Sequence, residues 1–249
     1  MNWENELKKL RVKRQKDSEH FKIFQRVFDE YTIKNIRTLI DRGIFRALDF
    51  PVSTGKEADV YRGSTRAGGY VAVKIYRIET GDFKNMWEYI LGDPRFKKVG
   101  KGKRALIREW CKKEFRNLSE AYNIGIRVPQ PFAFKENVLV MEFIGENGEA
   151  SPLLKDVKVK QPKALIDEVI TFIQRMYSEI RLVHADISEF NIMMKGEKPY
   201  LIDMGQAVNL KHPRALEFLK RDLYNVERMA KKMSVEVDHE KMYRQIVGV

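Results

Sequence analysis

His184-Ala-Asp186-Ile-Ser-Glu-Phe-Asn191, followed by Leu201-Ile-Asp203-Met-Gly205, is the part of the sequence that decides the fold and the chemistry. Asn191 lies five residues after Asp186, and Asp203 lies 12 residues after Asn191. Magnesium takes one or two protein oxygens besides waters and phosphates, so one aspartate and one asparagine suffice to hold it. The pattern therefore favours a magnesium-dependent phosphotransferase that uses ATP, rather than three polar residues that merely cap turns.

The run between Asn191 and Asp203 predicts a short β-hairpin. Residues 192–194 and 200–202 are mostly apolar, and the intervening residues 195–199 have the composition of a turn. Such a hairpin would bring Asp203 back beside Asn191.

Composition limits the class of protein. A chain of 249 residues with 43% hydrophobic and 33% charged residues is expected to be soluble and globular. The single Cys111 excludes an internal disulfide framework, and the sequence lacks a signal-peptide pattern and a membrane-length apolar run. We therefore expect a cytoplasmic protein without membrane contact. The net charge of +12 favours a polyanionic partner, although solubility would also account for it.

The N-terminal part is expected to be helical. Aromatic residues recur there at spacings of three and four, as on a helix that packs on a core: Phe21, Phe24, Phe28 and Tyr31. Thr32 is a candidate cap for a second helix, and Gly43 marks its end. Two clusters are candidate polyanion contacts or solvated charge runs: Lys8, Lys9, Arg11, Lys13, Arg14 and Lys16, and Lys97, Lys98, Lys101, Lys103 and Arg104.

Short β-like runs at residues 44–50, 58–62 and 70–76 predict an antiparallel meander, and 138–144 predicts another strand. Apolar spacing from Pro162 predicts a long helix that leads into the loop at His184. This order indicates an α+β chain folded as two lobes around a cleft. The expected parts are a helical extension at 1–42, an N-lobe at 43–144 with an irregular, mobile insertion near 79–103, and a helical C-lobe at 145–249.

The strand at 70–76 places Ala72 and Lys74 on one face. Lys74 could then lie over a ligand's phosphates while Ala72 leaves space for a ring. In a helix over 103–122, a turn of about 100° per residue puts Glu114 within an apolar stripe and Glu109 on the opposite, charged face. A carboxylate among apolar side chains is costly unless paired, so Glu114 is predicted to pair with Lys74 and Glu109 to lie at the surface. The stripe consists of Ile107, Cys111, Leu118 and Tyr122.

The loop at residues 53–57 opens no helix and is not a Walker loop. Its backbone N–H groups and the hydroxyls of Ser53 or Thr54 could still contact phosphate oxygens.

Five strings resemble the RIO family of atypical serine/threonine protein kinases, specifically its first subfamily. They are Ser-Thr-Gly-Lys-Glu-Ala-Asp-Val-Tyr at 53–61, Lys-Glu-Phe-Arg-Asn-Leu at 113–118, Val-Met-Glu-Phe-Ile-Gly at 140–145, the string at 184–191, and Leu-Ile-Asp-Met-Gly-Gln-Ala at 201–207. The likeness covers residues 20–235 or so, and the short chain resembles the archaeal members.

The resemblance implies a protein-kinase-like fold whose C-terminal lobe lacks an activation loop and a peptide-binding subdomain. It implies that Lys74 binds the α- and β-phosphates, that Glu114 braces it, that Asp186 is the catalytic-loop aspartate, and that Asn191 and Asp203 hold Mg²⁺ or, alternatively, Mn²⁺. It also implies ATP hydrolysis, with a phosphorylated intermediate on Asp203.

For ATP itself, the resemblance places Met141 at the entrance of the adenine pocket, with the Glu142 C=O and the Ile144 N–H on the adenine edge. The phosphate loop would use Ser53, Thr54 and Lys56, and Ala72 would face the ring. The family's association with small-ribosomal-subunit precursors suggests rRNA and ribosomal proteins as partners.

Departures from ordinary protein kinases bear on the acceptor. His184-Ala-Asp186 lacks the Arg of H-R-D, Asp203-Met-Gly205 replaces D-F-G, and no A-P-E follows. An extended-peptide substrate is therefore in doubt. Two alternatives remain: a small-molecule phosphotransferase of the aminoglycoside- or choline-kinase type, and a nucleotide-gated RNA-binding scaffold.

Overall fold

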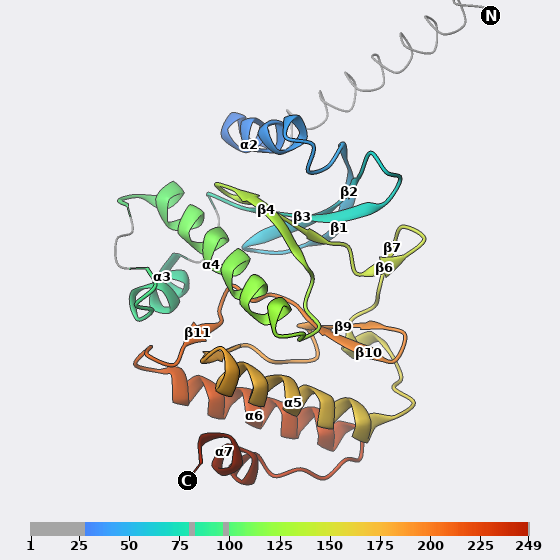
Figure 1. Ribbon diagram of the computed structural model, residues 1–249, viewed down its shortest axis with the longest axis vertical. Helices are drawn as coiled ribbons and strands as arrows, with labels where there is room; N and C mark the ends of the chain where they lie inside the picture. Colours follow the sequence, from blue (N-terminus) through green and yellow to red (C-terminus); the bar gives the residue numbers. More distant parts are fainter. Residues whose placement is uncertain (1–27, 80–82, 97–99, 249) are drawn as a thin grey trace, which may run out of the picture.

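The computed structural model describes residues 28–79, 83–96 and 100–248, and it confirms an α+β architecture with two lobes (Figure 1). Expectations for residues 1–27, including Phe21, Phe24 and the N-terminal basic cluster, lie outside the described residues, as do Lys97 and Lys98. Among the described residues, no helix combines the length and the apolar character that crossing a membrane requires.

A five-stranded antiparallel sheet in the order β1-β2-β3-β5-β4 forms the smaller lobe. Its strands are β1 Ala47–Thr54, β2 Ala58–Ser64, β3 Tyr70–Tyr76, β4 Pro131–Lys135 and β5 Val138–Glu142. Strand β4 was not predicted, and β1 continues through Pro51 instead of ending before it. Proline is tolerated because β1 is the edge strand, where its missing N–H breaks no ladder, and the pairing with β2 is irregular around Pro51.

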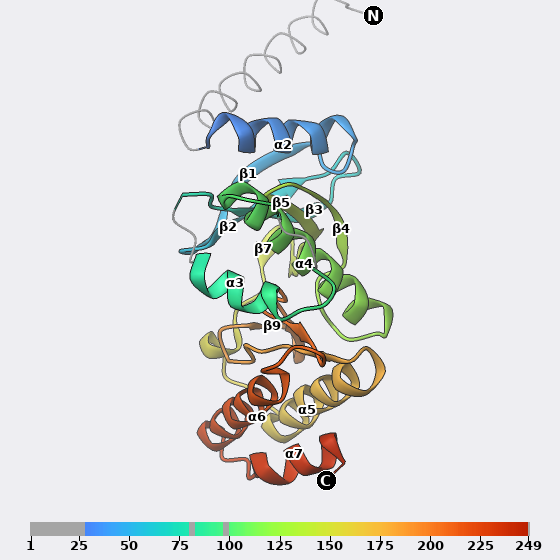
Figure 2. The ribbon, with the colours of Figure 1, turned by 90° about the vertical axis from the view of Figure 1, so that its left-hand side faces the viewer.

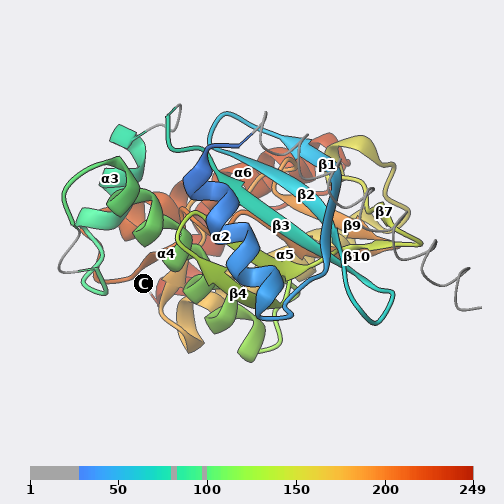
Figure 3. The same cartoon turned by 90° about the horizontal axis from the view of Figure 1, so that it is seen from above.

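Helix α2, Glu30–Asp41, lies across one face of this sheet (Figures 2 and 3). Ile36 and Leu39 belong there to one buried cluster with the β3 residues Val71 and Val73. The expectation that Thr32 caps the helix was wrong, because the helix starts earlier and Asp29 accepts the Thr32 N–H at 2.8 Å.

On the opposite face of the sheet, β3 presents Ala72, Lys74 and Tyr76 toward the second lobe, as the alternation of a strand requires. Helix α4, Lys103–Asn123, packs on this face (Figure 1). The strand alternation therefore decides which side chains reach the cleft.

The segment near 79–103 is not the irregular insertion that the sequence suggested. It contains helix α3, Phe83–Leu91, which buries Met86, Tyr89 and Ile90 in the core shared with α4. Its short apolar pattern was hidden among charged residues and glycines.

The larger lobe is helical. Helices α5, Pro162–Glu179, and α6, Ala215–Lys232, lie side by side, and α7, His239–Val247, packs beneath them (Figure 1). The short elements are β6 Gly145–Glu146, β7 Glu149–Ala150, the 3₁₀ turn η1 Leu154–Asp156, β8 Leu182–Val183, β9 Ile192–Lys195, β10 Lys198–Leu201 and β11 Val208–Asn209. Strands β9 and β10 form the predicted hairpin. Since α6 starts soon after β11, the lobe has no room for an activation segment.

Candidate active site

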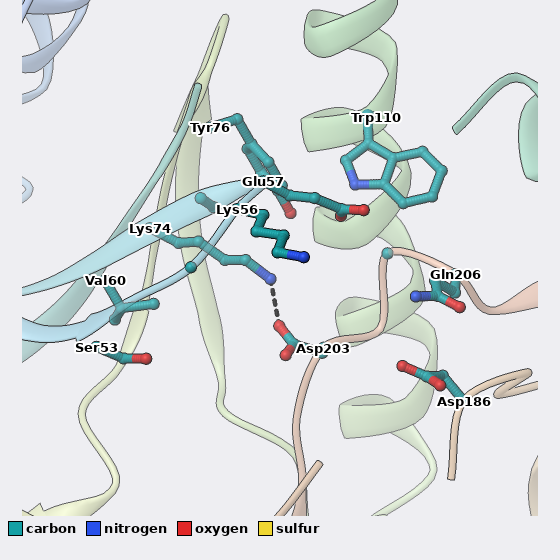
Figure 4. A pocket seen from close by; sticks show the side chains of 13 residues that line it. Ser53, Lys56, Glu57, Val60, Lys74, Tyr76, Trp110, Asp186, Asp203 and Gln206 are labelled. Atoms are coloured by element: carbon teal, nitrogen blue, oxygen red, sulfur yellow. Dashed lines mark hydrogen bonds and ion pairs between the residues drawn. The ribbon is translucent and has the colours of Figure 1, made fainter. Parts of the chain in front are cut away.

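Lys74 joins the two lobes. Its Nζ lies 2.9 Å from Glu114 Oε1. It also donates a hydrogen bond to Asp203 Oδ1 (Figure 4). The pairing of Lys74 with Glu114, which helix periodicity predicted, is thus present in the structure. Strand β3, helix α4 and the loop after β10 each contribute one of the three charges.

The charges stabilise one another against burial. Burial alone would lower the pKa of Lys74, but the carboxylates of Asp203 and Glu114 outweigh it and raise the pKa above its usual value. The positive charge of Lys74 lowers the pKa of Asp203. Burial raises the pKa of Glu114, which has 1% of its side chain exposed, against the opposing effect of Lys74.

Asp186 lines the cleft across from Lys74, and Asn191 holds its carboxylate. Asn191 Nδ2 donates to the Asp186 backbone carbonyl at 2.9 Å and to Asp186 Oδ2 at 2.7 Å. Burial raises the pKa of Asp186, although the bond from Asn191 opposes the shift. The Ile202 N–H donates to the Asn191 carbonyl at 3.0 Å, so the hairpin brings the segment preceding Asp203 beside Asn191, as predicted.

The donor set fits a magnesium ion. Because both amide hydrogens of Asn191 are directed at Asp186, the Asn191 Oδ1 is left as an acceptor. Asp203 pairs with Lys74 through Oδ1 and keeps its second carboxylate oxygen, and 49% of its side chain is exposed. A carboxylate oxygen of Asp203, which lines the cavity beside Lys74, and the amide oxygen of Asn191, which is held against the lining residue Asp186, are hard ligands of the kind that magnesium takes together with phosphate oxygens.

Asp222 of α6 holds the loop that carries Asp186. Its carboxylate accepts the N–H groups of Ala185 at 2.7 Å and Ile187 at 2.9 Å, the residues on either side of Asp186. Burial raises the pKa of Asp222 to about 7 against the opposing effect of these bonds. Ala185 has a φ of +67°, which is strained for a residue with a side chain, and Arg221 donates to its carbonyl oxygen. Sequence reasoning missed Asp222 because it lies 37 residues from Ala185.

A cavity of about 230 Å³ lies between these groups. The predicted residues Ser53, Lys56, Lys74, Asp186 and Asp203 line it (Figure 4). Additional lining residues are Gly55, Glu57, Ala58, Val60, Tyr76, Trp110, Gly205 and Gln206. Two of the residues that were missed carried a periodic signal, since Tyr76 shares a strand face with Lys74 and Trp110 lies about one helical turn before Glu114.

The expected adenine contacts lie beside this cavity rather than on its wall, as does Thr54. Ala72 and Met141 are register partners in β3 and β5, and both are buried. The Glu142 N–H donates to the Gln130 carbonyl at 2.8 Å, and the Ile144 carbonyl accepts the Ser151 N–H at 2.9 Å. The Glu142 C=O and the Ile144 N–H, the two groups expected to contact adenine, are not used by these two bonds.

Two expectations for α4 were wrong. Glu109 is not an ordinary surface residue, since only 11% of its side chain is exposed between Arg108 and Lys112. Tyr122 is 41% exposed instead of completing the apolar stripe. The helix is covered on more than one face near its N-terminal half, where α3 packs, and less so near its C-terminal end.

Comparison with known proteins gives a consistent result. A family model described as the RIO domain matches residues 59–242. The chain is 40% identical to the RIO-type serine/threonine-protein kinase Rio1 of Haloferax volcanii, over 94% of this chain and 81% of that protein. It is 36% identical to the kinase of the same name from Methanocaldococcus jannaschii, over 97% and 82% of the two chains.

Similarity extends to a eukaryotic kinase and to a solved structure. The chain is 39% identical to human serine/threonine-protein kinase RIO1, over 90% of this chain but only 42% of that protein. The solved Rio2 kinase–ADP/Mg²⁺–phosphoaspartate complex from Chaetomium thermophilum has the same fold, with a TM-score of 0.67, 22% identity and coverage of 84% of this chain and 64% of that one.

Proposed function

This chain belongs to the RIO family of serine/threonine protein kinases, and from that premise we propose that its cleft transfers the γ-phosphate of ATP through the residues described above. The observation that carries the proposal is the position of Lys74, paired with Glu114 and Asp203 opposite the Asp186–Asn191 pair. Lys74 binds the α- and β-phosphates, and Glu114 keeps the lysine extended into the cleft. Lys74 and Glu114 are largely shielded from water, so their mutual attraction is stronger than it would be at the surface.

Asn191 Oδ1 and the second oxygen of Asp203 would hold magnesium, which would neutralise charge on the phosphates when bound. Asp186 accepts the proton of the attacking hydroxyl. Its carboxylate is oriented by Asn191, and its backbone is fixed by Asp222, so the base is held in place before the substrate arrives. On the adenine side, Met141 and Ala72 border the ring, and Glu142 and Ile144 bind its edge. Ser53, Thr54 and Lys56 close over the phosphates.

ATP hydrolysis through Asp203 is a second use of the same groups. An Asp203 oxygen attacks the γ-phosphorus, ADP departs with the bond electrons, and water then cleaves the acyl phosphate. The exposure of 49% of the Asp203 side chain supports this route, in which the attacking oxygen of Asp203 no longer binds magnesium. A phosphoaspartate is named in the Rio2 complex from Chaetomium thermophilum, whose fold this chain shares.

The physiological partner that we propose is a precursor of the small ribosomal subunit. The net charge of +12 supports binding to rRNA, and Lys101, Lys103 and Arg104 are exposed around the start of α4. Membership in a protein-kinase family disfavours the aminoglycoside- or choline-kinase alternative, and the complete set of charged groups disfavours a scaffold without turnover.

The decisive experiment measures phosphate release from Mg·ATP and phosphate transfer to protein, each with and without purified small-subunit precursors. We expect turnover that the particles stimulate and that Asp186→Ala removes. Turnover that the particles leave unchanged would refute the proposed partner. Equal turnover by wild type and Asp186→Ala would refute the proposed site.

A further inference from the structure

Helix α4 makes a second set of contacts with the site, beside Glu114. Lys113 is fully buried, and its Nζ donates to the backbone carbonyl oxygens of Gly205 at 2.7 Å and Ala207 at 2.5 Å. Asn117 Nδ2 donates to the carbonyl oxygens of Met204 at 2.8 Å and Ala207 at 2.9 Å. Two side chains one helical turn apart thus bind three of the four carbonyls that directly follow Asp203.

A buried amine is costly unless its hydrogens are bonded. The bonds therefore satisfy the buried amine of Lys113 as well as the carbonyl oxygens of Gly205 and Ala207. The amine supplies at least two N–H groups whether it is protonated or neutral, which matches the two acceptors. Burial, which also lowers its pKa well below the usual lysine value, therefore does not remove the bonds.

The amide of Asn117 has only one sensible orientation. Its Oδ1 is buried without a partner among the described residues. Rotating the amide by 180° would place this oxygen against two carbonyl oxygens and lose both bonds. Asn117 therefore tolerates an unpartnered oxygen in order to hold Met204 and Ala207.

The backbone at Asp203 needs such support. Asp203 has a φ of +60°, a left-handed conformation that costs a residue with a side chain on the order of 1–3 kcal/mol and persists only when its surroundings impose it. Trp110, on the same helix, packs closely against Gly205, since a Cβ on Gly205 would lie 3.0 Å from the indole nitrogen. Three side chains of α4, those of Trp110, Lys113 and Asn117, thus hold residues 204–207.

We propose that Lys113 and Asn117 are positioning residues, which hold the backbone of residues 204–207 so that the Asp203 carboxylate faces the magnesium site. The inference rests on the proposed role of Asp203 as a magnesium ligand. One rigid helix then sets both halves of the phosphate site, since Glu114 places Lys74 while its neighbours on α4 place Asp203. Outer residues that orient a metal ligand typically change metal affinity by about 10- to 100-fold when they are removed.

The test uses calorimetric binding of a non-hydrolysable ATP analogue over a series of magnesium concentrations and in excess EDTA. Lys113→Met should raise the half-saturating magnesium concentration by about 10- to 100-fold, and Asn117→Ala should raise it by less. Affinity in EDTA should stay close to that of the wild type. The matched controls are Lys112→Met and Arg116→Ala, since both side chains are about half exposed on the same helix and should leave both curves unchanged.

Asp203→Asn separates this inference from the proposed function. If Asp203→Asn leaves the magnesium curve unchanged, Asp203 is not a ligand and the proposed function fails with it. If Asp203→Asn shifts the curve and Lys113→Met does not, only the positioning role is refuted. Equal losses with magnesium and in EDTA would also refute it, since they would indicate general damage to the cleft. Should Lys113→Met fail to fold, Asn117→Ala, which removes one neutral amide, decides by the same criteria.

Discussion

At the scale of single residues, function depends on buried charges that are each stabilised by a hydrogen-bonding or oppositely charged partner. Asp186 is oriented by Asn191, and the peptide groups on both of its sides are bound by Asp222. The base can thus face the acceptor without being free to move. Pre-organisation of this kind lowers the barrier because no reorientation is needed during the reaction.

Replacement of Asp186 by Ala should reduce turnover by about 10²-fold or more, as expected for the loss of a positioned general base. Binding of Mg·ATP, measured by calorimetry, should persist because Lys74 and Asp203 remain. In the wild type, turnover should fall as the pH is lowered through the raised pKa of Asp186. A variant that is folded and nearly as active as the wild type would contradict the assignment.

His184 predicts a pH dependence of stability. Burial lowers its pKa to about 4, from 6.5, while its Nε2 lies 3.2 Å from the Ile202 carbonyl oxygen. As the pH falls below 6.5, His184 binds a proton in the unfolded chain but remains neutral in the folded chain. The free energy of unfolding should therefore fall by about 3 kcal/mol between pH 6.5 and 4 through this residue. Denaturant unfolding at a series of pH values gives the free energy of unfolding of the wild type and of His184→Leu. The additional decrease between pH 6.5 and 4 should occur in the wild type alone, and parallel plots of free energy against pH would disprove it.

At the scale of elements, α4 is the organiser of the cleft. Its successive turns present Trp110, then Lys113 and Glu114, then Asn117, to the site. Spacings of three and four residues place them on one side of the helix. A change in the helix phase would displace all of these contacts together, so the helix acts as one rigid unit.

Glu114→Gln should impair catalysis strongly, because it leaves the Lys74 charge buried with only Asp203 as a partner. Glu109→Gln should change turnover little, although Glu109 is also buried, because its partners Arg108 and Lys112 lie outside the cleft. Steady-state kinetics of the two variants, with melting temperatures as a check on folding, measure the difference. Similar losses of turnover in both would mean that the role of Glu114 is merely structural.

At the scale of the whole molecule, two lobes meet at a cleft that is bridged by the Lys74–Asp203 pair. One hydrophobic cluster lies between α2 and the sheet. The other is continuous from the opposite sheet face through α4 into the helical lobe. Because this core crosses the boundary between the lobes, the packing of α4 fixes the position of one lobe relative to the other.

If the excess positive charge serves rRNA binding, affinity for small-subunit rRNA should fall steeply with salt as bound counterions are released. Replacing Lys101, Lys103 and Arg104 by Ala should reduce the slope of log affinity against log salt by about two to three. Filter binding over a salt series measures the slope, with the exposed α6 residues Lys220, Arg228 and Lys231 as a charge-matched comparison. An equal effect from both sets would show that the basic residues act only through net charge.

Local periodicity determined much of this protein from the sequence alone. The period of two in β3 placed Ala72 and Lys74 on the cleft face, the helical period chose Glu114, and apolar runs around a turn predicted the β9–β10 hairpin. Each of these features depends on neighbours a few residues apart. Regular backbone geometry then fixes which side chains share a face, whatever the rest of the chain does.

Only the tertiary structure decided which residues support the site from a distance. Asp222 reaches Ala185 from another helix, and Lys113, which stands in a charged part of the sequence, is buried against a loop 92 residues away. The burial of Glu109 and the folding of α3 likewise follow from packing between elements. Such contacts depend on how helices and loops are placed against each other, and hydrophobic periodicity within one segment carries no information about that placement.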